Sequence, residues 1–167
     1  HGFGGSRNEY LKGLGLDPTA FWEAFHTVEE PEQRVQATYR HEDAAFVSTL
    51  DVPIGLVTHS QPPVAYPVLD TLGMTEWFDV IVTCSEELGW KPDPGPLEQA
   101  MKELGVDPDY QDGVLAGDGL NDIQAAKNAG LESIHIDRHE PGRGDVQIAG
   151  DYQITSFAEL SMTSASD

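Results

Sequence analysis

Segment 113–130, GVLAGDGLNDIQAAKNAG, constrains the fold of this chain more than any other stretch. It opens with a short apolar run typical of a buried parallel strand, and the run breaks at a Gly-Asp-Gly turn. Asn121 and Asp122 are candidates for the N-cap of a following helix, and Gly130 is a natural C-terminal stop. The segment predicts strand, turn and helix, with Asp118 and Asp122 at the strand's carboxyl end, where open α/β sheets bind ligands.

Two interpretations of these carboxylates follow from their spacing. In the first, Asp118 shapes the turn and Asp122 caps the helix, and neither takes part in chemistry. In the second, both converge on a hard cation, because Mg²⁺ prefers oxygen ligands and is commonly held by one or two carboxylates, waters and a substrate phosphate. The spacing alone leaves both interpretations open.

The net charge of the chain disfavours two classes of binding partner. It carries 29 acidic against 9 basic residues, a formal net charge of −20, which argues against binding to nucleic acid or to an anionic membrane surface. The acidic residues are spread among regular strand and helix patterns, which argues against disorder. We interpret the composition as that of a folded halophilic protein, since high salt screens repulsion. An acidic mesophilic protein is the alternative.

Cysteine content and hydropathy indicate the compartment. Cys84 is the single cysteine, so the chain has neither an intramolecular disulfide nor a cysteine metal cluster. No apolar run approaches the roughly 18 residues of a spanning helix, and the first residues lack the features of a signal peptide. We therefore predict a soluble, cytoplasmic protein of about one domain, long enough to bury a core.

The hydrophobic period changes near residue 51. Up to residue 50 the pattern is helical, in three short segments of which the third covers 31–50. Beyond it, short apolar runs alternate with helical patterns. Strands are predicted at 54–57, 79–83, 114–116, 132–137 and 152–154, and helices at 63–72, 96–104, within 113–130 and at 157–160. The alternation predicts an α/β fold, a parallel sheet with helices on both faces, preceded by a small helical appendage.

Four side chains follow the predicted strands at one edge of this sheet. Thr58 ends the first strand, Lys91 lies in a Trp-Lys-Pro-Asp-Pro turn after the second, and Asp118 and Asp122 follow the third. Taken singly, Thr58 could cap a strand end and Lys91 could be a solvated surface lysine. Together they can bind a phosphoryl group: the carboxylates hold Mg²⁺, the ammonium neutralises negative charge, and the hydroxyl donates to a phosphate oxygen.

Three motifs carry a family resemblance. GLVTHS (55–60), WKPDPGPLEQAM (90–101) and VLAGDGLNDIQAAKNAG (114–130) resemble motifs two, three and four of the haloacid dehalogenase-like (HAD) superfamily, most closely its phosphoglycolate phosphatase-type branch. The likeness covers about residues 50 to 160. It implies a Rossmann-like core, Mg²⁺ dependence, and phosphoryl transfer through an aspartyl-phosphate.

The resemblance also assigns roles to residues. Thr58 and Lys91 would hold the phosphate and the nucleophile, and Asp118 and Asp122 would hold the metal. Residues 1–50 would be a remnant of the helical cap that closes over the substrate, and residues 51–167 the Rossmann-like core. His59 stands where many members carry Asn, a departure that bears on nearby substrate contacts.

The family's first motif is not found in this sequence. That motif, Asp-x-Asp-x-Thr, ends an apolar strand and supplies the nucleophile and the general acid. Asp17 lacks the second aspartate, and Asp51 precedes its strand instead of ending it. In the family the strand that carries this motif is central, between the strands leading to Thr58 and Asp118. Without it, we expect unpaired backbone groups on both neighbouring strands and a gap in the core. We therefore expect the natural chain to begin upstream of His1.

These observations predict a Mg²⁺-dependent phosphatase that hydrolyses a small phosphorylated metabolite, with its nucleophilic aspartate outside the given sequence. One alternative is a non-catalytic binding or assembly module that kept the fold after losing the first motif. A second is a 2-haloacid dehalogenase, which uses no Mg²⁺.

Overall fold

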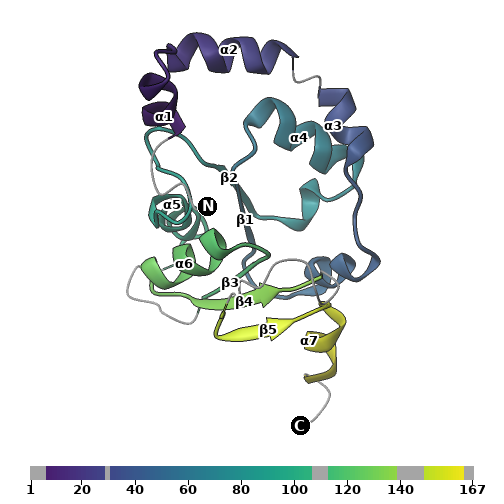
Figure 1. Cartoon of the computed structure of the whole chain (residues 1–167). Helices are drawn as coiled ribbons and strands as arrows, with labels where there is room; N and C mark the ends of the chain where they lie inside the picture. The colour runs from purple at the N-terminus through teal and green to yellow at the C-terminus, as the bar shows by residue number, and fades with distance from the viewer. Residues whose placement is uncertain (1–6, 29–30, 107–112, 139–148, 164–167) are drawn as a thin grey trace.

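The computed structural model describes residues 7–28, 31–106, 113–138 and 149–163. Its first part is helical, as predicted, and its later part alternates strands and helices, which confirms the α/β class. The elements before the first strand are α1 (Arg7–Gly13), α2 (Pro18–Val28), α3 (Pro31–Ala37) and the 3₁₀-helix η1 (Glu42–Thr49) (Figure 1).

The third predicted helical segment, 31–50, divides into α3 and η1. The backbone between them is extended at His41, with φ −67° and ψ 142°. Tertiary contacts of Arg40 account for the break. Its guanidinium donates to the Leu72 carbonyl at 3.2 Å and lies 5.0 Å from the centre of the Trp77 ring. The sequence pattern did not predict the break because the competing contacts come from residues far along the chain.

Within the described residues, the later part of the chain contains five short strands and the helices that connect them. The strands are β1 (Gly55–Thr58), β2 (Val80–Thr83), β3 (Val114–Gly117), β4 (Glu132–Ile136) and β5 (Tyr152–Ile154). The helices are α4 (Pro62–Thr71), η2 (Thr75–Trp77), α5 (Gly95–Glu103), α6 (Leu120–Asn128) and α7 (Ala158–Thr163). Every strand pair is parallel, as the short continuous apolar runs predicted.

The described strands form two sheets instead of one. β1 pairs with β2, and β3, β4 and β5 form a second sheet in that order, so β1 and β3 are not paired with each other within the described residues. The carbonyl of Thr58 accepts from the Cys84 N–H on the β2 side at 2.8 Å. Since successive residues of a strand direct their backbone groups to alternate edges, the Val57 carbonyl points to the edge away from β2.

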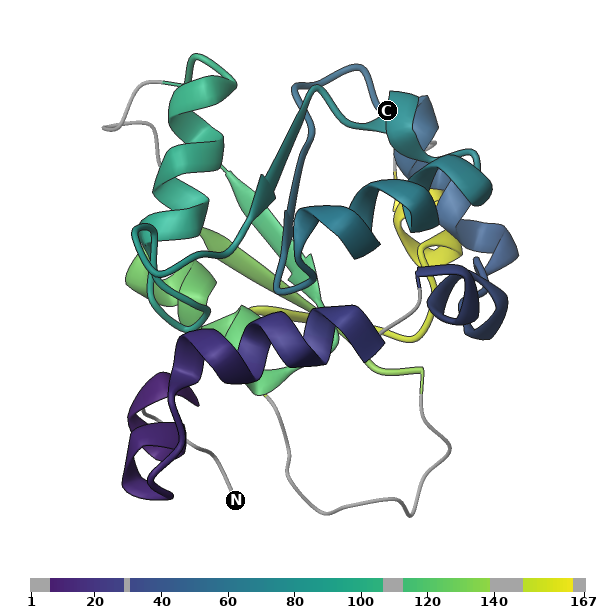
Figure 2. The ribbon, with the colours of Figure 1, turned by 90° about the horizontal axis from the view of Figure 1, so that it is seen from above.

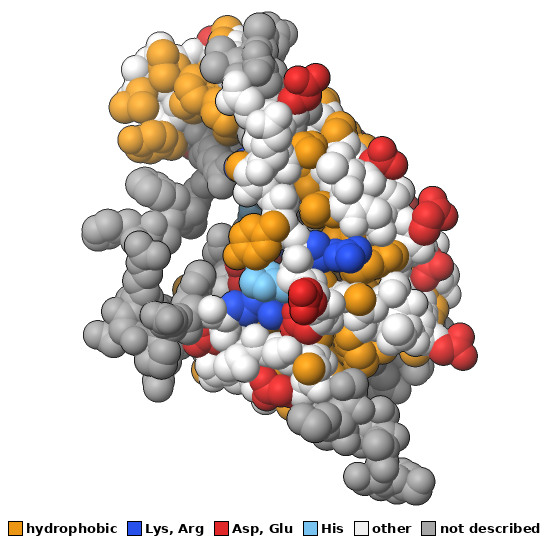
Figure 3. Space-filling view, turned by 90° about the vertical axis from the view of Figure 1, so that its right-hand side faces the viewer, with side chains coloured by type: hydrophobic (Ala, Val, Ile, Leu, Met, Phe, Trp, Pro, Cys, Tyr) orange, Lys and Arg blue, Asp and Glu red, His pale blue; other side chains and the backbone are white. Residues whose placement is uncertain are grey.

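Helices cover each sheet. α5 packs on β1 and β2, and α4 lies on the opposite side of this strand pair (Figure 2), while α6 packs on β3 and β4. Buried apolar side chains occupy these contacts, among them Val82, Leu97, Ala125 and Ala126. On the face in Figure 3, the Asp and Glu side chains are scattered over the surface and do not merge into one patch.

A cluster around Asp43 joins η1 to the C-terminal part of the chain. One oxygen of Asp43, Oδ2, accepts from Arg138 Nη2 at 2.8 Å, from Ser156 Oγ at 2.7 Å and from the Phe157 N–H at 2.8 Å. The rings of Phe46 and Phe157 stack with centroids 6.3 Å apart. Residues 42–49 therefore pack against the C-terminal elements, and the domain boundary at residue 50 stays a prediction.

We expect Asp43→Asn to destabilise the protein at neutral pH. The hydrogen bond from Arg138 lowers the pKa of Asp43 to about 2, from an ordinary value of 3.8. A lowered folded-state pKa contributes stability that is complete above about pH 4 and is lost as the pH falls towards 2. Urea unfolding at pH 7 should show a loss on the order of 1–2 kcal/mol, shrinking towards zero near pH 2. Glu42→Gln, at an exposed neighbouring position, should show no such loss. A loss in Glu42→Gln as large as in Asp43→Asn would contradict the stabilising role of the Asp43 carboxylate.

None of the helices in the described segments has the length and apolarity that crossing a membrane requires.

Candidate active site

The four predicted site residues all lie at the carboxyl ends of strands. Thr58 is the last residue of β1, Lys91 lies in the turn from β2 to α5, Asp118 follows β3, and Asp122 lies in the first turn of α6. Two of them are in direct contact: Lys91 Nζ lies 2.6 Å from Asp122 Oδ1, and the two side chains are only 12% and 15% exposed. Lys91 is therefore not a solvated surface lysine.

The Lys91 ammonium also contacts the open edge of β1. It donates to the Val57 carbonyl at 3.1 Å, and this carbonyl points away from β2. A single ammonium thus connects the first sheet to the helix that covers the second. An ammonium has three donors, so it can still donate to an anionic ligand.

Asp122 holds the start of α6 from within the helix. The N-cap is Gly119, not Asn121 or Asp122 as predicted, and the Gly119 N–H donates to Asp122 Oδ2 at 3.1 Å. Gly117 makes this arrangement possible, because an added Cβ there would lie 2.4 Å from the Asp122 Cβ. Asp122 therefore uses one oxygen to cap the helix and the other to bind Lys91, so capping and a role in the site are compatible.

Thr58 and Asp118 are less closely tied to this pair. Thr58 Oγ1 accepts from the Ser60 N–H at 3.1 Å, which orients the hydroxyl so that its hydrogen can be donated to a ligand. The Asp118 side chain is exposed and forms no hydrogen bond or ion pair with the described residues. The structure thus brings Lys91 and Asp122 together. It places Thr58 at the end of β1 and Asp118 after β3, and neither side chain forms a hydrogen bond or ion pair with Lys91 or Asp122 among the described residues.

Two further contacts join the turns that carry Thr58 and Lys91. The rings of His59 and Trp90 meet edge to face with centroids 5.8 Å apart, and Gln61 Nε2 donates to the Cys84 carbonyl at 3.2 Å. Sequence reasoning did not identify the role of Gln61, because a side chain that reaches a carbonyl 23 residues away leaves no local pattern.

Cys84 lies beside these turns but is not a candidate nucleophile. Its side chain is fully buried, and burial raises the pKa of its thiol above the ordinary value. A reactive cysteine needs an accessible thiolate. Cys84 is better explained as a packing residue between the two turns.

The carboxylates fit a magnesium ion as a partial ligand set. Among the described residues, no group of three or more His, Cys, Asp or Glu side chains could hold a metal. Mg²⁺ does not require such a group, because it retains waters and binds through one or two carboxylates together with a substrate phosphate. Among the described residues neither Asp118 oxygen has a hydrogen-bond partner, and Asp122 has its Lys91-facing oxygen, so this donor set suits Mg²⁺ bound with a phosphate.

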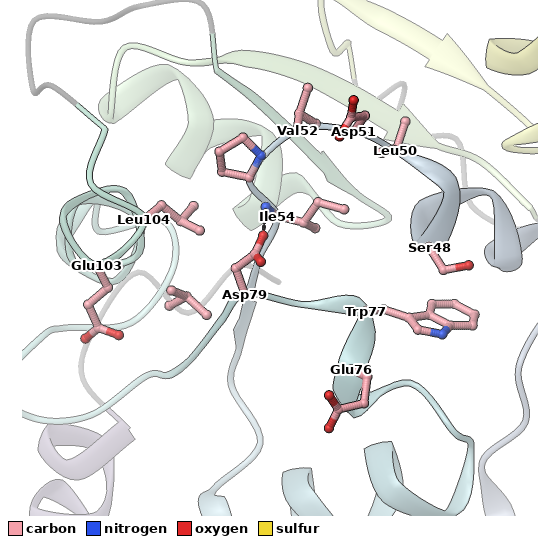
Figure 4. A pocket seen from close by; sticks show the side chains of 12 residues that line it. Ser48, Leu50, Asp51, Val52, Ile54, Glu76, Trp77, Asp79, Glu103 and Leu104 are labelled. Carbon is pink, nitrogen blue, oxygen red and sulfur yellow. Dashed lines mark hydrogen bonds between the residues drawn. The ribbon is translucent and has the colours of Figure 1, made fainter.

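A pocket of about 630 Å³ lies elsewhere, at the amino ends of β1 and β2 (Figure 4). Its lining combines apolar side chains with acidic residues. One of these, Asp79, accepts from the Ile54 N–H at 2.8 Å and so holds the start of β1. Ligands of open α/β sheets bind at the carboxyl ends of strands, so we assign the site to the Lys91 side of the sheet and not to this pocket.

The sequence is similar to known hydrolases. A family model described as haloacid dehalogenase-like hydrolase matches residues 9–130. Phosphoglycolate phosphatase from Escherichia coli K12 is 37% identical over 85 residues, covering 51% of this chain and 33% of that protein. The enzyme of the same name from Salmonella paratyphi A is 37% identical over 83 residues, covering 50% and 32%. The match spans about a third of the length of these curated relatives.

Solved structures show the same fold. A HAD phosphatase from Thermococcus onnurineus superposes with a TM-score of 0.67 at 20% identity, covering 94% of this chain and 85% of that one. L-2-haloacid dehalogenase from Xanthobacter autotrophicus gives 0.66 at 17% identity, covering 94% and 72%. A point mutant of CbbY from Rhodobacter sphaeroides, in complex with xylulose-(1,5)bisphosphate, gives 0.52 at 30% identity, covering 65% and 48%.

Proposed function

This chain belongs to the haloacid dehalogenase-like hydrolase family, and from that premise we propose that it is the Mg²⁺-dependent phosphatase part of a cytoplasmic enzyme acting on a small phosphate monoester. The relatives support this class of substrate, since several are phosphoglycolate phosphatases and one structural neighbour, CbbY, is in complex with xylulose-(1,5)bisphosphate. The single cysteine and the scattered acidic surface fit a reducing, salt-rich cytoplasm.

One observation carries the proposal: Lys91 Nζ lies 2.6 Å from Asp122 Oδ1 and 3.1 Å from the Val57 carbonyl beside Thr58. An ammonium is thereby held, little exposed, between a carboxylate and a strand end that carries a hydroxyl. We assign phosphate binding to Thr58 and Lys91, and Mg²⁺ binding to Asp118 and Asp122. When bound, Mg²⁺ would neutralise charge on the phosphoryl oxygens.

We further propose that the nucleophile is an aspartate on a strand that pairs with both β1 and β3. The open edges of these two strands support this, because a strand between them would satisfy backbone groups on both. Its carboxyl end would then lie between Thr58 and Asp118. The aspartate oxygen would attack phosphorus, and the ester oxygen would leave as the alcohol after taking a proton from the general acid of the same first motif. Water would then attack the phosphorus and pass a proton back to that acid's carboxylate, which releases inorganic phosphate and restores the aspartate.

Chelation provides the test. We expect the full-length protein to release inorganic phosphate from a panel of small monoesters, phosphoglycolate included, in the presence of Mg²⁺. EDTA should abolish the release and excess Mg²⁺ should restore it, because two carboxylates beside a phosphate dianion need a cation to offset their charge.

The other outcomes separate the alternatives. Halide release from 2-haloacids that continues in EDTA, without phosphate release, would replace the proposal by a dehalogenase. No turnover of any ester by the full-length protein would favour a non-catalytic module.

A further inference from the structure

The turn that carries Lys91 has a second attachment to α6. Asn128, the last residue of that helix, donates from Nδ2 to the Pro92 carbonyl at 2.9 Å. Pro92 directly follows Lys91, so the hydrogen bond fixes the backbone next to the ammonium-bearing residue. The other attachment is the ion pair between Lys91 and Asp122 in the first turn of α6.

The two attachments are well separated along the helix. Asp122 and Asn128 are six residues apart, which corresponds to about 9 Å at roughly 1.5 Å per residue. A turn attached only through the flexible lysine side chain could pivot about the ion pair. A second attachment at the far end of the helix removes that freedom, so the direction of the lysine side chain becomes defined.

The turn itself transmits this constraint. The Asp93 N–H donates to the Trp90 carbonyl at 2.8 Å, and the Gly95 N–H donates to Asp93 Oδ1 at 3.1 Å. Gly95 packs so closely that an added Cβ would lie 2.2 Å from the Leu88 carbonyl oxygen. A displacement of Pro92 would therefore move the turn as a unit, with Lys91 in it.

We propose that Asn128 is a positioning residue that acts through Lys91. It makes no contact with a ligand in this proposal; it sets where the Lys91 ammonium lies relative to Asp122 and to the end of β1. The catalytic consequence rests on the proposed function, because it requires Lys91 to bind phosphate. The structural link between Asn128 and Lys91 does not depend on that function and can be tested separately.

The first arm is a double-mutant cycle on thermal stability without ligand. Melting temperatures are measured for the wild type, Asn128→Ala, Lys91→Met and the double variant, with Gln124→Ala as the control at an exposed position of the same helix. If Asn128 acts through Lys91, the two shifts in melting temperature are not additive, and Asn128→Ala has a smaller effect in the Lys91→Met background. Additive shifts would overturn the proposal.

The second arm measures the affinity for inorganic phosphate in the presence of Mg²⁺. Asn128→Ala should weaken binding by about tenfold, since a small misplacement of a binding group has large effects, and Gln124→Ala should leave it unchanged. Wild-type affinity in Asn128→Ala would overturn the positioning role. Non-additive melting shifts together with no phosphate binding in the wild type would support the link to Lys91 and contradict the proposed function instead.

Discussion

Asp118→Asn is expected to lower kcat/KM for Mg²⁺-dependent phosphate release by about 10²–10³-fold while the fold stays intact. The amide keeps the shape of the side chain but removes one of the two negative charges proposed to hold the cation. Because Asp118 is exposed and forms no hydrogen bond or ion pair with the described residues, its charge contributes little to folding. Initial rates across a Mg²⁺ titration and a melting curve measure both effects.

The control for this variant is Asp70→Asn, an exposed aspartate on α4 away from the strand ends. It should match the wild type in rate and in melting temperature. That result would show that loss of one acidic charge from this chain does not by itself lower kcat/KM. Near-wild-type turnover by Asp118→Asn would remove Asp118 from the metal site.

Lys91→Met is expected to impair both activity and stability. The substitution leaves the Asp122 carboxylate, only 15% exposed, without its counter-charge. Breaking a buried ion pair on one side costs about 3 kcal/mol, which urea unfolding should resolve. Turnover should fall by about 10³-fold, because the ammonium is proposed to neutralise charge on the phosphoryl group.

Lys102→Met is the matched control, since Lys102 is exposed on α5. The substitution removes the same charge and makes the same change in side-chain length as Lys91→Met. It should leave the free energy of unfolding and the rate unchanged. Equal free energies of unfolding for the two variants would show that the Lys91–Asp122 ion pair does not stabilise the fold. Full activity of Lys91→Met would exclude Lys91 from phosphate binding.

Local patterns predicted the elements that carry the site. The apolar run, the Gly-Asp-Gly turn and the terminal glycine of segment 113–130 correspond to β3, α6 and a helix stop at Gly130, whose φ is +74°. The N-cap prediction was wrong, because an aspartate can hold a helix start from the cap position or from inside the first turn. Asp122 uses the second arrangement, and sequence spacing does not distinguish the two.

Side-chain contacts between segments far apart in the chain could not be predicted from the sequence. The rule that parallel strands share a carboxyl edge anticipated that Lys91 and Asp122 would be near each other. It could not indicate that they form an ion pair, nor that the ammonium reaches the Val57 carbonyl 34 residues away. The hydrogen bond from Asn128 to Pro92 spans 36 residues, and no feature of either local sequence points to it.

The most direct test of the site assignment is a crystal structure of the full-length protein with Mg²⁺ and orthovanadate, an analogue of the transferring phosphoryl group. We expect the metal at Asp118 and Asp122, and the vanadate oxygens within hydrogen-bond distance of Thr58 Oγ1 and Lys91 Nζ. A vanadate bound elsewhere, for example in the pocket at the amino ends of β1 and β2, would contradict the account, as would a metal that contacts neither aspartate.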